Sequence, residues 1–143
     1  MSTRAQKRLR SKGRSSTDSF VSLPHRLMDS RAFASLSPRA TKLLLDLAAQ
    51  YRGMNNGDLS APLSVLKKRG WNSSDQLAKA KKELIAKGLI IVSRQGGLNR
   101  CSLYALTWKP IDDCSGKLDV RATNTASNLW KQWTDSKEGS TKP

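Results

Sequence analysis

Apolar residues recur with the period of an α-helix between residues 37 and 52. Ser37 followed by Pro38 is a typical helix start, because the serine caps the first turn and proline fits the first helical position. Gly53 comes directly after this segment and predicts its end. The pattern therefore predicts a helix over residues 37–52. Its buried face contains Ala40, Leu43, Leu44, Leu47, Ala48 and Tyr51.

A second helical pattern begins at Ser73, and Gln76 follows it at the spacing of a capping box. Gly88 ends the pattern in the position that glycine commonly takes after a helix. We expect the apolar stripe of this helix to pack against Leu43, Leu44 and Leu47. The stripe consists of Leu77, Ala80 and Leu84, with Ile85 at its margin. The opposite, polar face holds Asp75, Lys79, Lys82 and Ala86, flanked by Gln76 and Ala78.

A shorter helix is predicted between these two. Residues 55–58 have the composition of a turn, and Leu59 after them predicts a very short strand. Ser60 can cap a helix that begins near Pro62 and carries Leu63, Val65 and Leu66. The basic residues 67–69 follow, and residues 70–72 predict the tight turn into the next helix.

Two apolar segments after Gly88 have the length of β-strands, over residues 89–92 and 102–107. Residues 94–100 connect them, with an arginine at each end. Two adjacent glycines in this connection would let nucleic acid approach the backbone closely. We therefore expect a β-hairpin with a basic tip.

Less regular segments flank this core. Residues 1–18 hold six basic side chains and almost no apolar ones, so they cannot bury enough surface to fold. Residues 25–36 predict a short helical stretch, and residues 126–133 a short amphipathic helix within a polar tail. The inward side chains of the first are expected to be Leu27, Met28, Phe33 and Leu36. Those expected to share one side of the second are Leu129, Trp130 and Trp133.

This order of elements predicts an α+β, mostly α fold. A three-helix core plus a β-hairpin wing is the arrangement of a winged helix-turn-helix. The predicted DNA-binding domain covers residues 19–110, between a flexible basic arm at residues 1–18 and a polar C-terminal tail at residues 111–143.

Charge indicates the class of partner. The 143 residues include 26 Lys and Arg against 11 Asp and Glu, a formal net charge of +15. Polyanions are attracted to such a chain, and counterion release favours its complex with nucleic acid. The excess extends beyond the arm, because residues 19–108 hold fourteen basic and five acidic side chains. The alternatives are a solvated basic surface and an acidic protein partner.

The polar face of the 73–87 helix occupies the position of a recognition helix in the DNA major groove. Its lysines could contact guanine or phosphate, Gln76 adenine, and Asp75 cytosine. The wing arginines suit phosphate or the minor groove. The predicted DNA-binding residues are Lys67, Lys68, Arg69, Ser74, Asp75, Gln76, Lys79, Lys82, Arg94, Asn99 and Arg100, with Arg4, Arg8 and Arg10 in the arm.

Catalytic and metal chemistry find no support in the sequence. Cys101 and Cys114 lack metal-ligand spacing, and His25 could not complete a zinc site with them. No nucleophile or paired-carboxylate constellation can be assembled around His25, so we expect a non-enzyme without cofactor or metal. The chain has no apolar run of membrane-spanning length and no signal-peptide pattern, so we expect a cytoplasmic protein.

The tryptophans suggest two uses. Trp71 and Trp108 are expected to fill the core beneath the turn and the wing. Trp130 and Trp133, together with Leu129, either dock the tail on the domain or bury against a second protomer in a homodimer. The sequence leaves both alternatives open.

Three segments within about residues 20–112 together resemble small winged-helix proteins of bacterial phages, plasmids and integrated mobile elements. They are FVSLPHRLMDSRAFASLSPRATKLLLDLAAQYRGMNNGDLS, RGWNSSDQLAKAKKELIAKGLI and SLYALTWKPID. The resemblance implies the fold and a bacterial host more than a task. The leading expectation is a sequence-specific binder of double-stranded DNA that regulates transcription. A replication or partition accessory protein is one alternative, and an inhibitor of a host protein, such as an anti-defence factor, is another.

Overall fold

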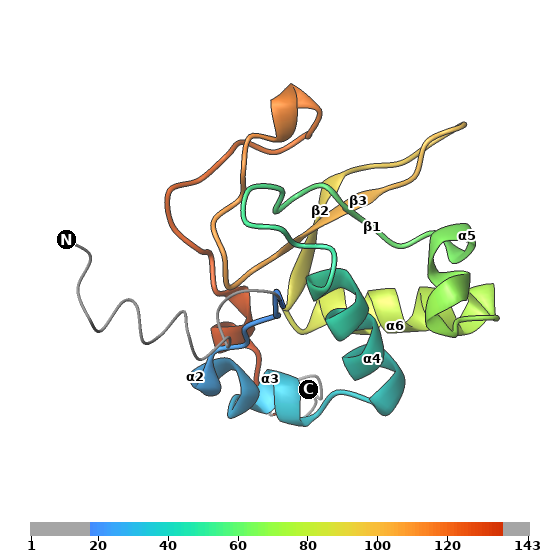
Figure 1. The fold of residues 1–143 in the computed structure, drawn as a ribbon. Helices are drawn as coiled ribbons and strands as arrows, with labels where there is room; N and C mark the ends of the chain where they lie inside the picture. The colour runs from blue at the N-terminus through green and yellow to red at the C-terminus, as the bar shows by residue number, and fades with distance from the viewer. Residues whose placement is uncertain (1–17, 136–143) are drawn as a thin grey trace, which may run out of the picture.

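The computed structural model describes residues 18–135, which form an α+β fold with a three-stranded antiparallel sheet (Figure 1). Two longer helices, α4 (Pro38–Ala48) and α6 (Ser74–Ala86), pack against each other. Between them along the chain lie β1 (Leu59–Ser60), α5 (Leu63–Leu66) and the 3₁₀ turn η1 (Lys67–Arg69). The hairpin of β2 (Ile90–Arg94) and β3 (Leu103–Leu106) follows α6.

The core lies where the two helical patterns meet, as the sequence predicts. Leu43, Leu44 and Leu47 of α4 are fully buried, and Leu77 and Leu84 of α6 are at most 2% exposed. Each apolar stripe needs a second surface to leave water, and the two helices supply it to each other. The predicted core roles of Trp71 and Trp108 are also confirmed.

The start of α4 is as predicted, but its end is not. The Ser37 hydroxyl accepts a hydrogen bond from the Ala40 amide at 3.1 Å, whereas the helix ends at Ala48 instead of residue 52. Gln50 explains the early end, because its side chain bonds both the N–H and the C=O of Ser60. These bonds tie the chain after Ala48 to β1. Ser60 therefore does not cap α5, whose N-cap is Pro62.

Both ends of α6 follow the sequence signals. The Ser73 hydroxyl accepts from the Gln76 amide at 3.2 Å. Gly88 has a φ of 78°, and the Leu89 amide bonds the Leu84 carbonyl at 3.0 Å, the two marks of a glycine-ended helix. A Cβ at residue 88 would lie 2.8 Å from the backbone of Leu129, so glycine is also required by the packing of the C-terminal segment.

The sheet has the order β1-β3-β2, with β1 as the predicted short third strand. A bulge interrupts the pairing of β2 and β3 between Val92 and Arg94. Asn56, in the turn before β1, is fully buried and ties this turn to β3. Its side chain donates to the Leu106 carbonyl at 3.0 Å and accepts from the Leu106 amide at 2.7 Å. The hairpin extends away from the helices at its tip (Figure 1).

The N-terminal helical stretch is split, contrary to the prediction. It forms α2 (His25–Met28) and α3 (Arg31–Ala34), because the Ser30 hydroxyl caps a new helix by accepting from the Phe33 amide. Leu27 is buried as expected, but Met28 is 43% exposed and does not face the core.

The C-terminal segment packs on the domain. After η2 (Cys114–Gly116), the Asp119 amide bonds the Ser93 carbonyl at the edge of β2. The predicted short helix exists as the 3₁₀ turn η3 (Leu129–Gln132), which contacts α3. Its two apolar residues do not share one side: Trp130 is 4% exposed within the core of its own chain, whereas Leu129 is 37% exposed. Trp133 follows η3 and is partly buried against the same core. Of the two alternatives, Trp130 and Trp133 therefore follow the one in which the tail docks on its own domain.

Candidate nucleic-acid interface

The polar face of α6 is open along the helix. Its exposed residues include almost every predicted base-contacting side chain, namely Ser74, Asp75, Gln76, Lys79 and Lys82. The Lys79 ammonium lies 3.8 Å from the Asp75 carboxylate, in a pair whose two side chains are 69% and 81% exposed. Such an exposed pair contributes little to stability and can open when a stronger anion approaches. The structure therefore leaves all five residues accessible on α6.

The basic turn before α6 is exposed and held in place from below. Lys67, Lys68 and Arg69 form η1, and all three are exposed. Asp46 of α4, itself only 7% exposed, lies beneath them. Its carboxylate accepts from the Trp71 indole at 2.7 Å and lies 3.8 Å from the Arg69 guanidinium.

Lys42 completes this anchor. Its ammonium donates to the Asp46 carboxylate at 3.0 Å and to the Arg69 carbonyl at 2.7 Å. We call Asp46, Lys42 and Trp71 the turn anchor. It fixes the path of the chain between η1 and α6, so α4 determines where the exposed face of α6 starts. Lys42 and Asp46 are not predicted from the sequence, because no local pattern marks contacts between residues 25 and 27 positions apart.

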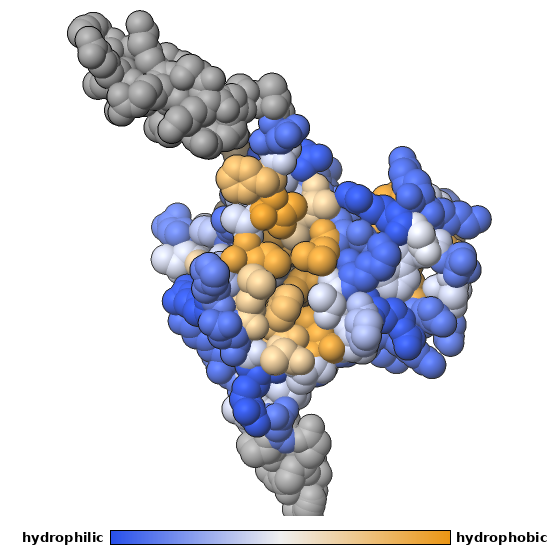
Figure 2. Space-filling model, turned by 60° about the horizontal axis from the view of Figure 1, so that its bottom comes forward, coloured by the Kyte–Doolittle hydropathy of each residue, from blue (hydrophilic) through white to orange (hydrophobic). Residues whose placement is uncertain are grey.

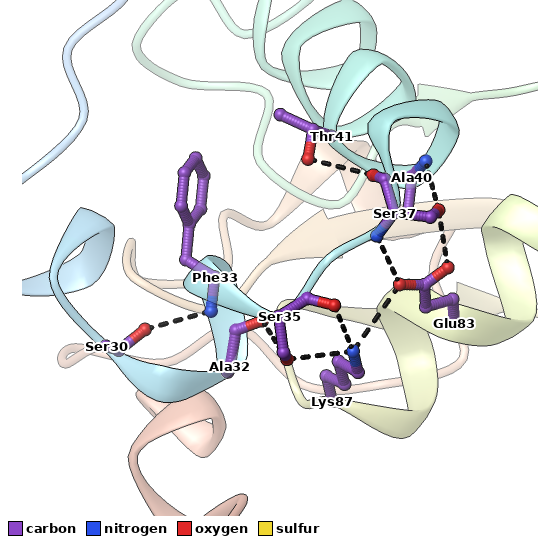
Figure 3. A network of polar contacts seen from close by, with 9 residues as sticks. All are labelled: Ser30, Ala32, Phe33, Ser35, Ser37, Ala40, Thr41, Glu83 and Lys87. Atoms are coloured by element: carbon purple, nitrogen blue, oxygen red, sulfur yellow. Dashed lines mark hydrogen bonds and ion pairs between the residues drawn. The ribbon is translucent and has the colours of Figure 1, made fainter.

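A second polar network joins the start of α4 to the end of α6 (Figure 3). The Glu83 carboxylate accepts from the Ser37 amide at 2.8 Å and from the Ser37 hydroxyl at 2.7 Å. Lys87 donates to the Ser35 carbonyl and hydroxyl at 2.9 Å and lies 3.5 Å from Glu83. A carboxylate at a helix N-terminus satisfies free amides and complements the helix dipole.

The pKa of Glu83 reflects these contacts. Desolvation by burial acts to raise it, but the hydrogen bonds from Ser37 and the charge of Lys87 outweigh burial. The pKa of Glu83 is therefore lowered, and the carboxylate is charged at neutral pH. The Lys87 ammonium also lies 4.8 Å from the centre of the Trp133 ring, which links the network to the C-terminal segment.

The tip of the β2–β3 hairpin, which the sequence predicts to be a wing, is a tight loop. Gly97 and Arg100 exchange two backbone hydrogen bonds at 2.9 and 3.1 Å, so that Leu98 and Asn99 project at the end. Leu98 is 92% exposed, and Asn99 has a φ of 60°. A Cβ at Gly96 would lie 2.5 Å from the Ser102 amide nitrogen. That glycine is thus required by the hairpin itself, whereas residue 97 has open space around it.

The two arginines of the hairpin differ in exposure. Arg94 is partly buried, and it donates to the Cys101 carbonyl at 2.9 Å across the hairpin. Its buried Nε has no hydrogen-bond partner within residues 18–135. Arg100 and Asn99 are exposed. The structure therefore offers Arg100 to a ligand more directly than Arg94.

Lys81 was not among the predicted residues. It is half-buried on α6, and burial lowers its pKa, although the Cys101 thiol partly offsets this effect. Lys81 is thus less accessible than its neighbours Lys79 and Lys82, which are exposed.

The remaining predictions concern the basic arm, a metal site and a membrane-spanning segment. Arg4, Arg8 and Arg10 lie outside the described residues. Within residues 18–135, no cluster of three or more His, Cys, Asp or Glu side chains could hold a metal ion. In the same part of the chain, no helix has the length and apolar character needed to cross a bilayer.

Comparison with known proteins assigns no family to this geometry. No family model, no curated protein and no solved structure matches the chain.

Proposed function

We propose that the protein is a winged helix-turn-helix that binds double-stranded DNA in a sequence-specific manner. In this proposal α6 is the recognition helix in the major groove, η1 contacts the backbone beside it, and the β2–β3 hairpin is the wing. Transcriptional regulation on a phage or other mobile element is the role that we favour, on the strength of the family resemblance of residues 20–112.

One observation carries the proposal: the face of α6 away from the core is fully accessible and rich in side chains that read bases. Gln76 and Lys79 point from a helix whose other face is buried against α4, so a groove can receive them without rearrangement of the core. The exposed basic turn at η1 lies directly before this face. Phosphate contacts from such a turn position a helix, and base contacts then specify the sequence.

Selection of bound genomic fragments at physiological salt tests the proposal. We expect enrichment of a short motif by the full-length protein. A motif near its own promoter supports regulation, and one in an origin supports replication or partition instead.

The double variant Gln76→Ala with Lys79→Ala should lose this enrichment. Arg121→Ala with Asn124→Ala is a matched control, because both residues are exposed on the C-terminal segment. The proposal fails if the wild-type protein enriches no sequence, or if the α6 variant enriches the motif as well as wild type does.

A protein partner is the second candidate, and an apolar surface favours it. Figure 2 shows apolar residues gathered on the lower face of the view in Figure 1, where α2 and α3 lie. The exposed apolar side chains of this N-terminal part include Phe20 at 85%, Val21 at 44% and Met28 at 43%. Clustered apolar surface often marks a protein contact. A host protein or a second copy of the chain would be retained on the wild-type protein and lost with Phe20→Ser.

A further inference from the structure

A cavity of about 340 Å³ lies at the end of the sheet opposite the wing tip. Three parts of the chain line it: residues 19–22 of the N-terminal segment, Ala48 at the end of α4 with residues 51–53 after it, and Leu106 at the end of β3 with residues 108–109 after it. Sites for small ligands are typically hollows of several hundred cubic ångströms with apolar walls and a few polar groups. No residue of α6 lines it, so the cavity is separate from the proposed DNA surface.

The charged residues that line the cavity are both basic. Arg52 and Lys109 are among the lining residues, and none of the described residues that line it is acidic. Lys109 Nζ lies 5.6 Å from the centre of the Tyr51 ring, and Arg52 donates to the Ala49 carbonyl at 2.8 Å. Both cations are thereby held beside the cavity, where an anionic group would meet complementary charge.

Trp108 is among the residues that line the cavity, and it is 6% exposed. Its indole N–H is buried and has no acceptor within residues 18–135. Trp108 therefore lies close enough to the cavity for its NMR signal to report on a ligand bound there.

We propose that the cavity binds a small organic anion that has an apolar or aromatic body and one carboxylate or phosphate group. The body packs on Phe20, Val21 and Leu106, and the anionic group lies toward Arg52 and Lys109. The segment of residues 1–17 is a poor occupant, because six of its side chains are basic and would face two further cations.

Titration of the full-length protein with 2-naphthoate, 2-naphthyl phosphate and the neutral 2-naphthamide tests this site. The four tryptophan indole N–H signals are followed by NMR. We expect one or both anions to give a saturable shift of the Trp108 signal, which Trp108→Phe identifies by removing it. At least one anion should bind about tenfold or more tightly than the amide, the equivalent of one charge-assisted contact.

Charge variants separate this site from general attraction. Arg52→Gln with Lys109→Gln should weaken binding of the anion about tenfold and leave the amide unaffected. Arg39→Gln with Arg121→Gln removes the same net charge from exposed positions outside the cavity and should change neither affinity.

Three results would overturn the proposal. The first is the absence of a saturable Trp108 shift with both anions. The second is an equal loss of binding in the two double variants. The third is a Trp108 shift produced by raising the protein concentration without ligand, because a second copy of the chain would then fill the cavity.

Discussion

The two faces of α6 differ in what their side chains touch. Leu77, Ala80 and Leu84 are almost fully buried against the rest of the core, whereas Gln76 and Lys79 are exposed. On the exposed face, the Lys79 ammonium lies 3.8 Å from the Asp75 carboxylate, so this ion pair joins two exposed residues and no buried one. Stability and binding can therefore be changed separately within one helix. The buried face determines the free energy of unfolding, and in our proposal the exposed face determines affinity for DNA.

The largest effect is expected from a substitution on the buried face of α6. Leu84→Ala should lower the free energy of unfolding by about 2–5 kcal/mol, because truncation of a buried leucine removes apolar packing and leaves a cavity. Denaturant unfolding measures it, and Lys82→Ala on the exposed face is the control, with a change of about 0.5 kcal/mol or less. Equal stability of Leu84→Ala and wild type would contradict the burial of Leu84 between α6 and α4.

A smaller loss should follow from breaking the turn anchor. Asp46→Ala leaves the buried Trp71 N–H without its acceptor and should cost about 1–3 kcal/mol of the free energy of unfolding. A double-mutant cycle with Trp71→Phe should show coupling between the two residues. The exposed Asp29→Ala is the matched control. Additive losses at Asp46 and Trp71 would contradict the hydrogen bond between them.

Substitutions on the exposed face of α6 should weaken DNA binding and leave stability almost unchanged. Gln76→Ala or Lys79→Ala should weaken binding to the selected DNA site by about 1–3 kcal/mol, the usual effect of removing a side chain that reads a base, and leave unfolding almost unchanged. Arg100→Ala should weaken binding to selected and scrambled DNA alike, as expected for a side chain that binds phosphate. Titration of each variant on both DNAs measures this. Equal losses on both DNAs for the α6 variants would show that this helix only positions the protein.

The smallest expected effect depends on pH and concerns Glu83. Because the folded pKa of Glu83 is lowered, its charged form stabilises the fold above its ordinary value of 4.5, and this stabilisation is lost as the pH falls through the folded pKa. The free-energy difference between wild type and Glu83→Gln should therefore be largest at neutral pH and shrink in acid. Gln76→Ala, on the exposed face of the same helix, removes no titratable group and is the control. A constant difference between pH 7 and acid would contradict the role of the Ser37 contacts.

The parts of the fold that the sequence predicts are those with local signals. The helices α4 and α6 follow from apolar periodicity, and Ser37, Ser73 and Gly88 mark their ends within a few residues. The exposed face of α6 follows from the same periodicity, because the residues opposite a buried stripe must point outward.

The parts that the sequence does not predict depend on distant partners. Gln50 ends α4 through bonds to Ser60, and Asp46 anchors Trp71 across 25 positions. Gly96 is a local exception: the close approach of the Ser102 backbone in its own hairpin leaves no room for a Cβ, and no sequence pattern marks that approach. Composition alone also could not decide that Trp130 docks on its own chain, since an apolar residue in a polar segment fits a partner equally well.

The contact between Gly88 and Leu129 also affects the order in which the core can close. The helices and the hairpin are complete in sequence at residue 106, but the core still lacks Trp130. A chain that has formed its helices and hairpin but has not docked residues 128–130 leaves this end of α6 uncovered. The last apolar surface closes only when these residues dock and the Asn128 amide bonds the Thr107 carbonyl at 2.8 Å. The surface around Gly88 is therefore the part of the core that depends on the C-terminal segment.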